Sequence, residues 1–401
     1  MNVADTGFML ICSAMVFFMV PGLALFYGGL VQSRNVLSTS MHSYILLGLG
    51  SIVWAVVGYS LAFGEDTMGI IGDFSFVFLS GVGMEPQEGA TIPHVLFMIF
   101  QCMFACLTPA LISGAYAERI KFSAMALFSV LWLLLIYAPM AHWVWGGGWL
   151  MELGALDFAG GAVVHMSSAA AALACAHALG PRLGLKTGET APHNLPFTLI
   201  GAGILWFGWF GFNAGSALAA DGLAANAFAT TQLATAAAML GWLTVEKIHS
   251  GKPTTFGAAS GALAGLVSIT PAAGFVTPMA AIAIGLVGGM LCYGAVYLKS
   301  RLGYDDALDV VGIHGVGGTW GALATGLWAS AAINGADGLF YGNASQLGIQ
   351  AISVVATWVF CYFGSRLILA VVNAVTPLRS TEDEEILGLD LSEHNERGYR
   401  L

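Results

Sequence analysis

Long apolar stretches alternate with short polar connections along almost the whole chain of 401 residues. Most are close to the roughly 20 residues that an α-helix needs to cross the hydrocarbon core of a bilayer. The pattern predicts eleven helices, with boundaries defined to within a few residues. They cover residues 7–31, 42–63, 93–117, 122–144, 158–179, 196–217, 225–247, 255–271, 278–299, 309–331 and 346–375. One long early loop, 64–91, and a charged tail, 377–401, lie outside the helices.

Composition indicates an all-α polytopic membrane protein. Hydrophobic residues make up 57% of the chain and charged residues only 9%, against roughly 25% charged residues in an average soluble domain. A net charge of −10 argues against a nucleic-acid-binding protein, which carries a basic surface. The six cysteines lie in apolar stretches, so we expect buried thiols and neither disulfides nor a metal site. The start MNVADTGFML lacks positive charge, and we expect no cleavable signal within it.

The distribution of charge predicts the orientation of the helices. All 13 Lys and Arg residues lie near the ends of odd-numbered helices or after them. Arg366 lies near the end of the eleventh, and Lys186 and Arg400 are among the others. The positive-inside rule then places the N-terminus outside and the C-terminus in the cytoplasm. Acidic residues gather on the opposite side: Asp5, Glu65, Asp66, Asp73, Glu85, Glu88, Glu152, Asp157, Asp221 and Asp337. This asymmetry either attracts cations to a pore or only sets the topology.

A faint internal repeat is present. The fifth predicted helix contains GGAVVHMSSAAAALA, and the tenth contains VVGIHGVGGTWGALA. Because the copies are five helices apart, they enter the membrane from opposite faces, as in transporters built from inverted repeats. We therefore expect a 5+5 arrangement with halves of about 7–180 and 196–331, and an eleventh helix outside it.

Two histidines are candidates for function. Only His165 and His314 of the nine histidines lie inside predicted spans away from the ends, and ionisable groups within a membrane are functional candidates by default. A structural hydrogen bond explains a single such histidine equally well. Their matching repeat positions favour a functional pair. A metal or haem pair is a weaker interpretation because further ligands and a haem-attachment motif are missing.

Aromatic side chains accompany the histidines. The groups are Phe100 and Phe104 with Gln101, then Trp143, Trp145 and Trp149, then Phe207, Trp209, Phe210 and Phe212 beside Ser216. Composition favours an interfacial belt for the tryptophans, while a cation–π box is the functional alternative. Asp157 fits either a helix N-cap or a carboxylate that stabilises a nearby cation. Asp309, five residues before His314, takes the comparable position in the tenth helix.

At these residues the sequence resembles the ammonium transporter family (Amt/Mep/Rh), prokaryotic Amt branch. The resemblance runs from about Phe8 to the tail. The matching stretches are PGLALFYGGLV (21–31), ISGAYAERIKFSA (112–124), WGGGW (145–149), DFAGGAVVH (157–165), WFGWFGFNAGSA (206–217), GKPTTFGAASGALAGLVSITPAAG (251–274) and DDALDVVGIHGVGG (305–318). DFAGGAVVH and WFGFNAGSA are the most specific of them.

The resemblance implies a homotrimer in the cell membrane, with eleven helices and one pore per protomer. By matching position, Trp145, Phe104 and Ser216 form an outer ammonium site that Asp157 supports, and Phe104 and Phe212 form a gate. His165 and His314 match the twin histidines of the pore. Gln101 and Thr270 match polar positions near the pathway. No cofactor is implied.

The resemblance also implies the function of an ammonium transporter, not an enzyme. We expect residues 1–376 to form the transporter domain and the tail 377–401 to be a cytoplasmic regulatory segment that docks a PII-type nitrogen-signalling protein. A merely solubilising acidic tail is the alternative. An electroneutral ammonia gas channel, an ammonium sensor and an intramembrane enzyme or haem protein remain as other functions. Sensors usually add an output domain, and only the tail follows the last predicted helix.

Overall fold

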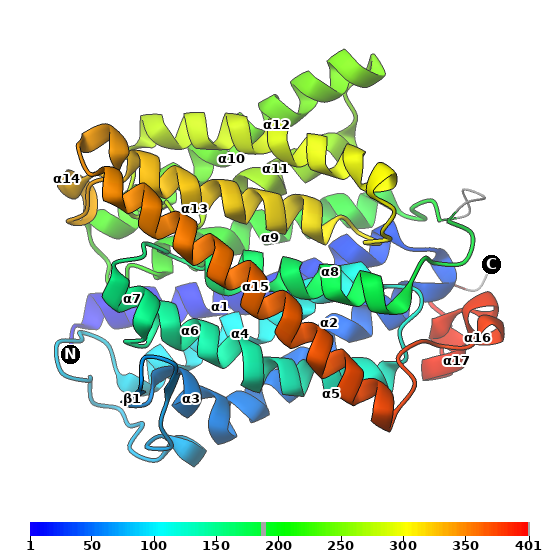
Figure 1. Ribbon diagram of the computed structural model, residues 1–401, viewed down its shortest axis with the longest axis horizontal. Helices are drawn as coiled ribbons and strands as arrows, with labels where there is room; N and C mark the ends of the chain where they lie inside the picture. The colour runs from blue at the N-terminus through cyan, green and yellow to red at the C-terminus, as the bar shows by residue number, and fades with distance from the viewer. Residues whose placement is uncertain (186–189, 400–401) are drawn as a thin grey trace.

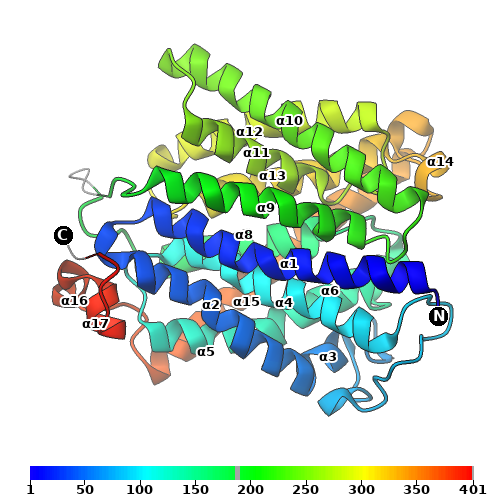
Figure 2. The ribbon, with the colours of Figure 1, turned by 180° about the vertical axis from the view of Figure 1, so that it is seen from behind.

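A computed structural model describes residues 1–185 and 190–399; Lys186 and Arg400 lie outside the described residues. The molecule is a bundle of long helices that run roughly along its long axis, and its two termini lie at opposite ends (Figures 1 and 2). This placement agrees with an odd number of crossings. The tail folds back as two short helices onto the end of the bundle where the C-terminus lies.

Each predicted helix is present. The N-terminal half contains α1 (Val3–Leu30), the continuous run α2, η2 and α3 (Val36–Val53, Trp54–Gly58, Tyr59–Phe63), α4 (His94–Tyr116), the run α5, η4 and α6 (Phe122–Trp132, Leu133–Tyr137, Ala138–Trp145), and η5 with α8 (Gly161–Met166, Ser167–Leu179). The C-terminal half contains α9 (Leu195–Gly215), α10 (Gly222–Ser250), α11 (Thr255–Ile269), α12 (Pro278–Leu302), η6 with α13 (Val311–Gly315, Val316–Trp328), and α15 (Ala344–Val375).

Short elements connect these helices. They are η1 (Ser33–Asn35), the antiparallel pair β1 and β2 (Asp66–Thr67, Ile71–Gly72), η3 (Val77–Leu79), α7 (Trp149–Leu153), α14 (Ala331–Asn334), η7 (Leu339–Tyr341), α16 (Glu382–Leu387) and α17 (Leu389–His394). Nine helices among the described residues are long and apolar enough to cross a membrane. The 15-residue α11 and the η6–α13 segment fall outside that set, so eleven crossings and the orientation of the termini stay predictions.

Local sequence explains several helix starts. Side-chain oxygens of Asp221, Thr254 and Thr277 accept hydrogen bonds from the first turns of α10, α11 and α12, which supplies partners to otherwise unpaired N–H groups. Proline occupies the first turn of α9 and α12, where its missing N–H costs nothing.

Small residues permit close helix packing in the bundle. α1 packs along the length of α9, and a Cβ at Gly201 would collide with the backbone of Phe26 and Gly22. Glycine there lets the two backbones approach, as is common between membrane helices. α10, α11 and α12 pack together, and α15 crosses over α8 and α13 (Figure 1).

The tail is folded against the bundle. Asp390 Oδ1 accepts a hydrogen bond from the Ser38 backbone N–H at 2.8 Å, and Asn35 Oδ1 accepts one from the Leu389 N–H at 2.8 Å. A side chain at the start of each of the helices α2 and α17 therefore accepts a hydrogen bond from the first turn of the other helix. Arg379 forms an ion pair with Glu385 and donates to the Leu179 carbonyl at 2.8 Å. These contacts tie residues 379–390 to two connections at the same end of the molecule, the one that leads into α2 and the one that follows α8.

Candidate functional site

A hollow at the N-terminal end of the bundle brings together most of the predicted outer site. Gln101, Phe104, Trp145 and Ser216 all line it, and its volume is about 200 Å³. They come from α4, the end of α6 and the end of α9. Aromatic faces attract cations, and a hydroxyl oxygen accepts hydrogen bonds. The outer hollow is thus suited to a small cation that carries N–H donors.

Backbone contacts fix the two key side chains of the outer hollow. Trp145 Nε1 donates to the Asp157 carbonyl at 2.9 Å. Ser216 Oγ donates to the Phe212 carbonyl at 2.8 Å, so its lone pairs stay available to accept from a ligand. The indole and the hydroxyl are therefore held in place before any ligand enters.

Asp157 acts on this site through the backbone. Its side chain is buried and does not line the outer hollow. Oδ1 accepts from the N–H groups of Gly160 and Gly161 at 3.0 and 2.6 Å, and Oδ2 accepts from those of Ala162 and Val163 at 2.8 and 3.3 Å. The carboxylate thus supplies acceptors to the first turn of η5, although Gly160 and not Asp157 occupies the N-cap position. The Asp157 carbonyl holds Trp145.

Two stacked phenyl rings close the floor of the outer hollow. The rings of Phe104 and Phe212 lie 4.3 Å apart at 30°, and both side chains are fully buried. The Trp145 ring lies 6.1 Å from Phe104. The Phe212 ring lies 6.0 Å from the His165 ring on the other side. The phenyl pair therefore separates the outer hollow from the histidines.

The predicted histidine pair forms below the phenyl rings. His165 Nδ1 and His314 Nδ1 are 3.1 Å apart, so one ring donates to the other. Each histidine lies in a π-helical turn, η5 or η6, a feature that is frequent at functional sites. With both rings neutral, one Nε2 then carries a proton and the other carries a lone pair. Within the described chain, His165 Nε2 has no hydrogen-bond partner.

A narrow apolar cavity continues from the histidines toward the C-terminal end. Leu23, Leu107 and Leu111 are among its lining residues, and Tyr27 and Asp309 also line it. The volume open to the centre of a water-sized sphere is about 10 Å³, roughly what a single water molecule needs. Such a cavity accommodates small neutral molecules one at a time.

The structure corrects one repeat assignment. Asp306, and not Asp309, is the counterpart of Asp157: it precedes His314 by the same spacing as Asp157 precedes His165, and its Oδ2 accepts from the Val311 N–H of η6 at 2.7 Å. Asp309 instead pairs with Lys299. The equal spacing was visible in the sequence and could have identified Asp306.

Backbone hydrogen bonds of the residues that follow Asp157 and Asp306 are also related by the repeat. The Phe158 N–H donates to the Pro271 carbonyl just after α11 at 3.1 Å, and the Ala307 N–H donates to the Ala115 carbonyl near the end of α4 at 3.4 Å. α4 and α11 are the third helices of their respective halves. These paired bonds support the predicted inverted repeat.

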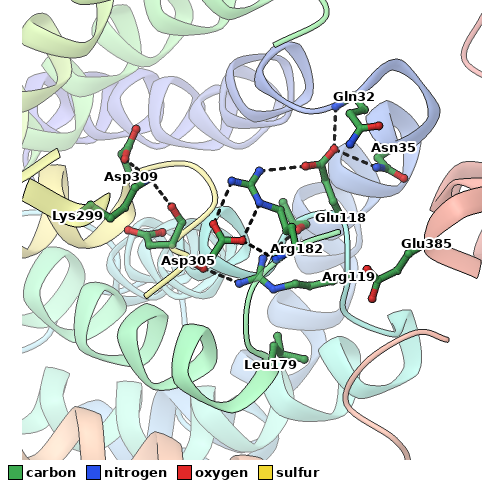
Figure 3. A network of polar contacts seen from close by, with 12 residues as sticks. Gln32, Asn35, Glu118, Arg119, Leu179, Arg182, Lys299, Asp305, Asp309 and Glu385 are labelled. Atoms are coloured by element: carbon green, nitrogen blue, oxygen red, sulfur yellow. Dashed lines mark hydrogen bonds and ion pairs between the residues drawn. The ribbon is translucent and has the colours of Figure 1, made fainter. Parts of the chain in front are cut away.

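An ion-pair network holds the segment that leads into η6 (Figure 3). Arg182 lies between Asp305 and Glu118, with nitrogen–oxygen distances of 3.0 Å to each. Glu118 also accepts from Asn35 at 3.0 Å. Burial by itself would raise the pKa of Asp305, but the hydrogen bonds and charge of Arg182 lower it below its ordinary range. Burial raises the pKa of neighbouring Asp306 to about 6.

Thr270 and Trp209 form a support beside the histidines. Thr270 lines neither the outer hollow nor the narrow cavity; its Oγ1 accepts from Trp209 Nε1 at 2.9 Å. The Trp209 ring stacks on His165 at 5.3 Å. Sequence reasoning placed Trp209 in the aromatic group without a role at the histidines. The structure assigns it this contact.

The other aromatic candidates divide between packing and surface. Trp143 and Trp149 contact each other with ring centroids 5.5 Å apart, and Trp143 Nε1 donates to the Ile70 carbonyl. Phe210 stacks on Phe228, and Phe207 is 54% exposed. The tryptophans thus divide between roles: Trp145 belongs to the outer hollow, Trp209 to the histidines, and Trp143 and Trp149 to the adjoining outer packing.

Comparisons with known proteins agree with this arrangement. Residues 7–399 match the model of the Ammonium Transporter Family. An ammonium transporter of Bacillus subtilis is 55% identical over 100% of this chain and 99% of its own. The crystal structure of Candida albicans Mep2 aligns with a TM-score of 0.92 at 35% identity, over 100% of this chain and 94% of that chain. A structure titled Sensor Amt Protein aligns with a TM-score of 0.91 at 31% identity, covering 98% of each chain.

Proposed function

Because this chain belongs to the ammonium transporter family, we propose that it binds ammonium in the outer hollow, deprotonates it, and conducts ammonia together with a relayed proton. The chain is a multi-pass membrane protein whose relatives transport ammonium. The finer proposal is supported by one observation above others: an aromatic hollow, a phenyl pair, a histidine pair and an apolar cavity follow one another in contact.

Physical chemistry favours deprotonation at the phenyl pair. Moving an unpaired ammonium ion into apolar surroundings is very costly, of the order of tens of kcal/mol in the limiting case. Burial lowers the pKa of amine-type cations for the same reason. Ammonia and a separated proton can therefore pass where the ion cannot. Potassium has no proton to lose, which supplies selectivity.

In this proposal the histidine pair carries the proton. Ammonium that passes Phe104 and Phe212 meets a ring nitrogen with a lone pair, which accepts the proton as the N–H bond breaks and leaves neutral ammonia. The proton crosses the Nδ1–Nδ1 contact and leaves from the second ring. Ammonia moves on through the narrow cavity and is reprotonated in water beyond it. The net result is movement of one positive charge per ammonium.

Liposomes that contain the purified protein provide the test. An ammonium jump is expected to produce a saturable current, and an equal potassium jump to produce none. His165→Ala and His314→Ala are each expected to remove the ammonium current or its selectivity against potassium. Thr244→Ala is a control, because Thr244 lies on an exposed stretch of α10 and bonds only its own helix. Intact current and selectivity in both histidine variants would refute the relay.

Two alternatives have their own signatures in this assay. A rapid internal pH change without current would indicate electroneutral passage of ammonia gas. Silence in both readouts from folded protein would favour a sensor.

We propose further that the protein is a homotrimer with eleven crossings, an outer N-terminus and a cytoplasmic tail that docks a PII-type protein. The exposed apolar stripe of Ile352, Val355, Val359 and Phe363 along α15 requires lipid or another subunit beside it. Native mass spectrometry tests the trimer. Deletion of residues 378–401, followed by transport and PII pull-down measurements, tests the role of the tail. If neither transport nor PII binding changes, the tail only solubilises the protein.

A further inference from the structure

A buried histidine joins the outer loop to the helix that carries Trp145. His142 lies in α6, one turn before Trp145, and its side chain is fully buried. Its Nδ1 lies 3.0 Å from the Ala62 carbonyl oxygen, and its Nε2 lies 2.8 Å from Asp66 Oδ1. We call Ala62, Asp66 and His142 the outer latch. None of the three was among the predicted site residues.

Both ring nitrogens of His142 face acceptors. A carbonyl oxygen can only accept, so Nδ1 must carry a hydrogen. The hydrogen bond from His142 lowers the pKa of the Asp66 carboxyl, and this partly exposed group is therefore an ionised acceptor at neutral pH. Nε2 must then carry a hydrogen as well. A ring that donates from both nitrogens is an imidazolium, so the latch is a buried cation paired with a carboxylate.

The latch connects two walls of the outer hollow. Phe63, next to Ala62, and Trp145 both line this hollow. Two further bonds join the same segments: Trp143 Nε1 donates to the Ile70 carbonyl at 2.7 Å, and the Trp149 N–H donates to the Gly69 carbonyl at 3.0 Å. Movement of the β1–β2 hairpin would therefore shift the wall that holds Trp145.

No other charged group competes for His142 in the described part of the chain. The elements that pack on α6 are α3, β2, η4, η5 and α7. Their titratable groups are Tyr59, Tyr137, His165 and Glu152, and the hairpin loop adds Glu65 and Asp73. Tyr59 bonds His94 at 2.6 Å, His165 bonds His314, and Asp73 accepts from the backbone of Glu65 and Ser75. Asp66 is the one carboxylate that bonds the ring.

We propose that His142 is a positioning residue for the outer hollow. Its two hydrogen bonds, to the Ala62 carbonyl and to the Asp66 carboxylate, hold the β1–β2 hairpin against α6 and so fix the wall that carries Trp145. The link to ammonium binding rests on the proposed function, but the attachment of the hairpin does not.

Backbone hydrogen exchange in the full-length purified protein tests the latch directly. The readout is the protection of residues 62–72 relative to an unstructured peptide of the same sequence. His142→Ala and Asp66→Ala, which each remove one partner of the bond between His142 Nε2 and Asp66 Oδ1, are each expected to lower this protection roughly tenfold, as for loss of a charged hydrogen bond.

A matched variant and a transport measurement complete the test. Asp73→Asn changes a carboxylate on the same hairpin that does not touch His142, and it is expected to keep the wild-type protection. In liposomes, His142→Ala is expected to raise the half-saturation concentration for ammonium roughly tenfold with a smaller change in maximal current.

The possible results separate the two proposals. Wild-type protection in His142→Ala, or equal protection in Asp66→Ala and Asp73→Asn, would overturn the latch. The expected exchange pattern without ammonium transport would support the latch while refuting the proposed function. Normal half-saturation in His142→Ala would overturn its positioning role.

Discussion

The two repeat-related aspartates are expected to respond in opposite ways to the same substitution. Asp157→Asn and Asp306→Asn each replace one carboxylate oxygen with an amide nitrogen. Asp157 uses both oxygens to accept four backbone hydrogen bonds. Asp306 accepts from the Val311 N–H through Oδ2, and its buried Oδ1 has no partner among the described residues.

The hydrogen bonds that each substitution removes or keeps determine how much it changes the free energy of unfolding. In Asp157→Asn, one pair of N–H donors loses its acceptor and faces an amide donor. At about 1.5–3 kcal/mol for each bond to a charged group, the loss is about 3–6 kcal/mol. In Asp306→Asn, the amide oxygen can keep the Val311 bond. The substitution also removes a carboxylate whose pKa burial raises from 3.8 to about 6, which corresponds to a cost of about 3 kcal/mol at neutral pH. Asp306→Asn is therefore expected to be neutral or stabilising.

The raised pKa of Asp306 also predicts a pH dependence. Because the folded state binds this proton more tightly than the unfolded state, the ionised group destabilises the fold above about pH 6. That cost is relieved as pH falls from about 6 toward 3.8. The gain in stability from Asp306→Asn over wild type should therefore be largest at neutral pH and shrink as the pH falls through this window.

Thermal unfolding of the purified variants, followed by tryptophan fluorescence at several pH values, measures these effects. Asp157→Asn should unfold several degrees earlier and lose most ammonium transport, because η5 carries His165. Asp306→Asn should unfold no earlier than wild type at neutral pH. Equal destabilisation by both substitutions, or an Asp306→Asn difference that does not change with pH, would refute the reasoning.

Two further predictions concern the supports of the site. Thr270→Val leaves buried Trp209 Nε1 unpaired, at a cost of about 1–3 kcal/mol, and should lower the ammonium current several-fold. Thr270→Ser retains the acceptor and should keep the current. Equal currents in the two variants would contradict this prediction. Asp390→Ala removes the acceptor for the Ser38 N–H and should speed limited proteolysis of the chain beyond Pro377. Glu396→Ala, at an exposed position, should not. Equal rates of proteolysis in the two variants would show that this bond does not hold the tail.

Much of the helical layout followed from the sequence, because apolar runs of membrane-spanning length are local features. The ranges predicted for α1, α4 and α15 agree with the structure to within a few residues. The range predicted for the tenth helix was less accurate. Residues 309–331 contain η6 and α13, and α14 begins separately at Ala331. Breaks of this kind depend on caps and turns, which hydrophobicity does not report.

The candidate site was predicted in part. His165 and His314 stood out because ionisable residues inside apolar runs are rare, and motif resemblance added Phe104, Phe212, Trp145 and Ser216. The π-helical turns that carry the histidines, the support of Trp209 by Thr270 and the outer latch could not be predicted. The last two depend on contacts between residues far apart in the chain, such as the 3.0 Å approach of His142 to Ala62.

The sequence by itself determined the membrane environment, the approximate helices, the family resemblance and the two histidines, since all of these depend on residue type and local spacing. Only the tertiary structure decided that Asp157 acts through backbone N–H groups, that Trp209 stacks on His165, and that the tail caps α2. Hydrogen-bond partners are chosen by which backbone and side-chain groups packing brings within about 3 Å, and the one-dimensional pattern of apolar residues does not encode that choice.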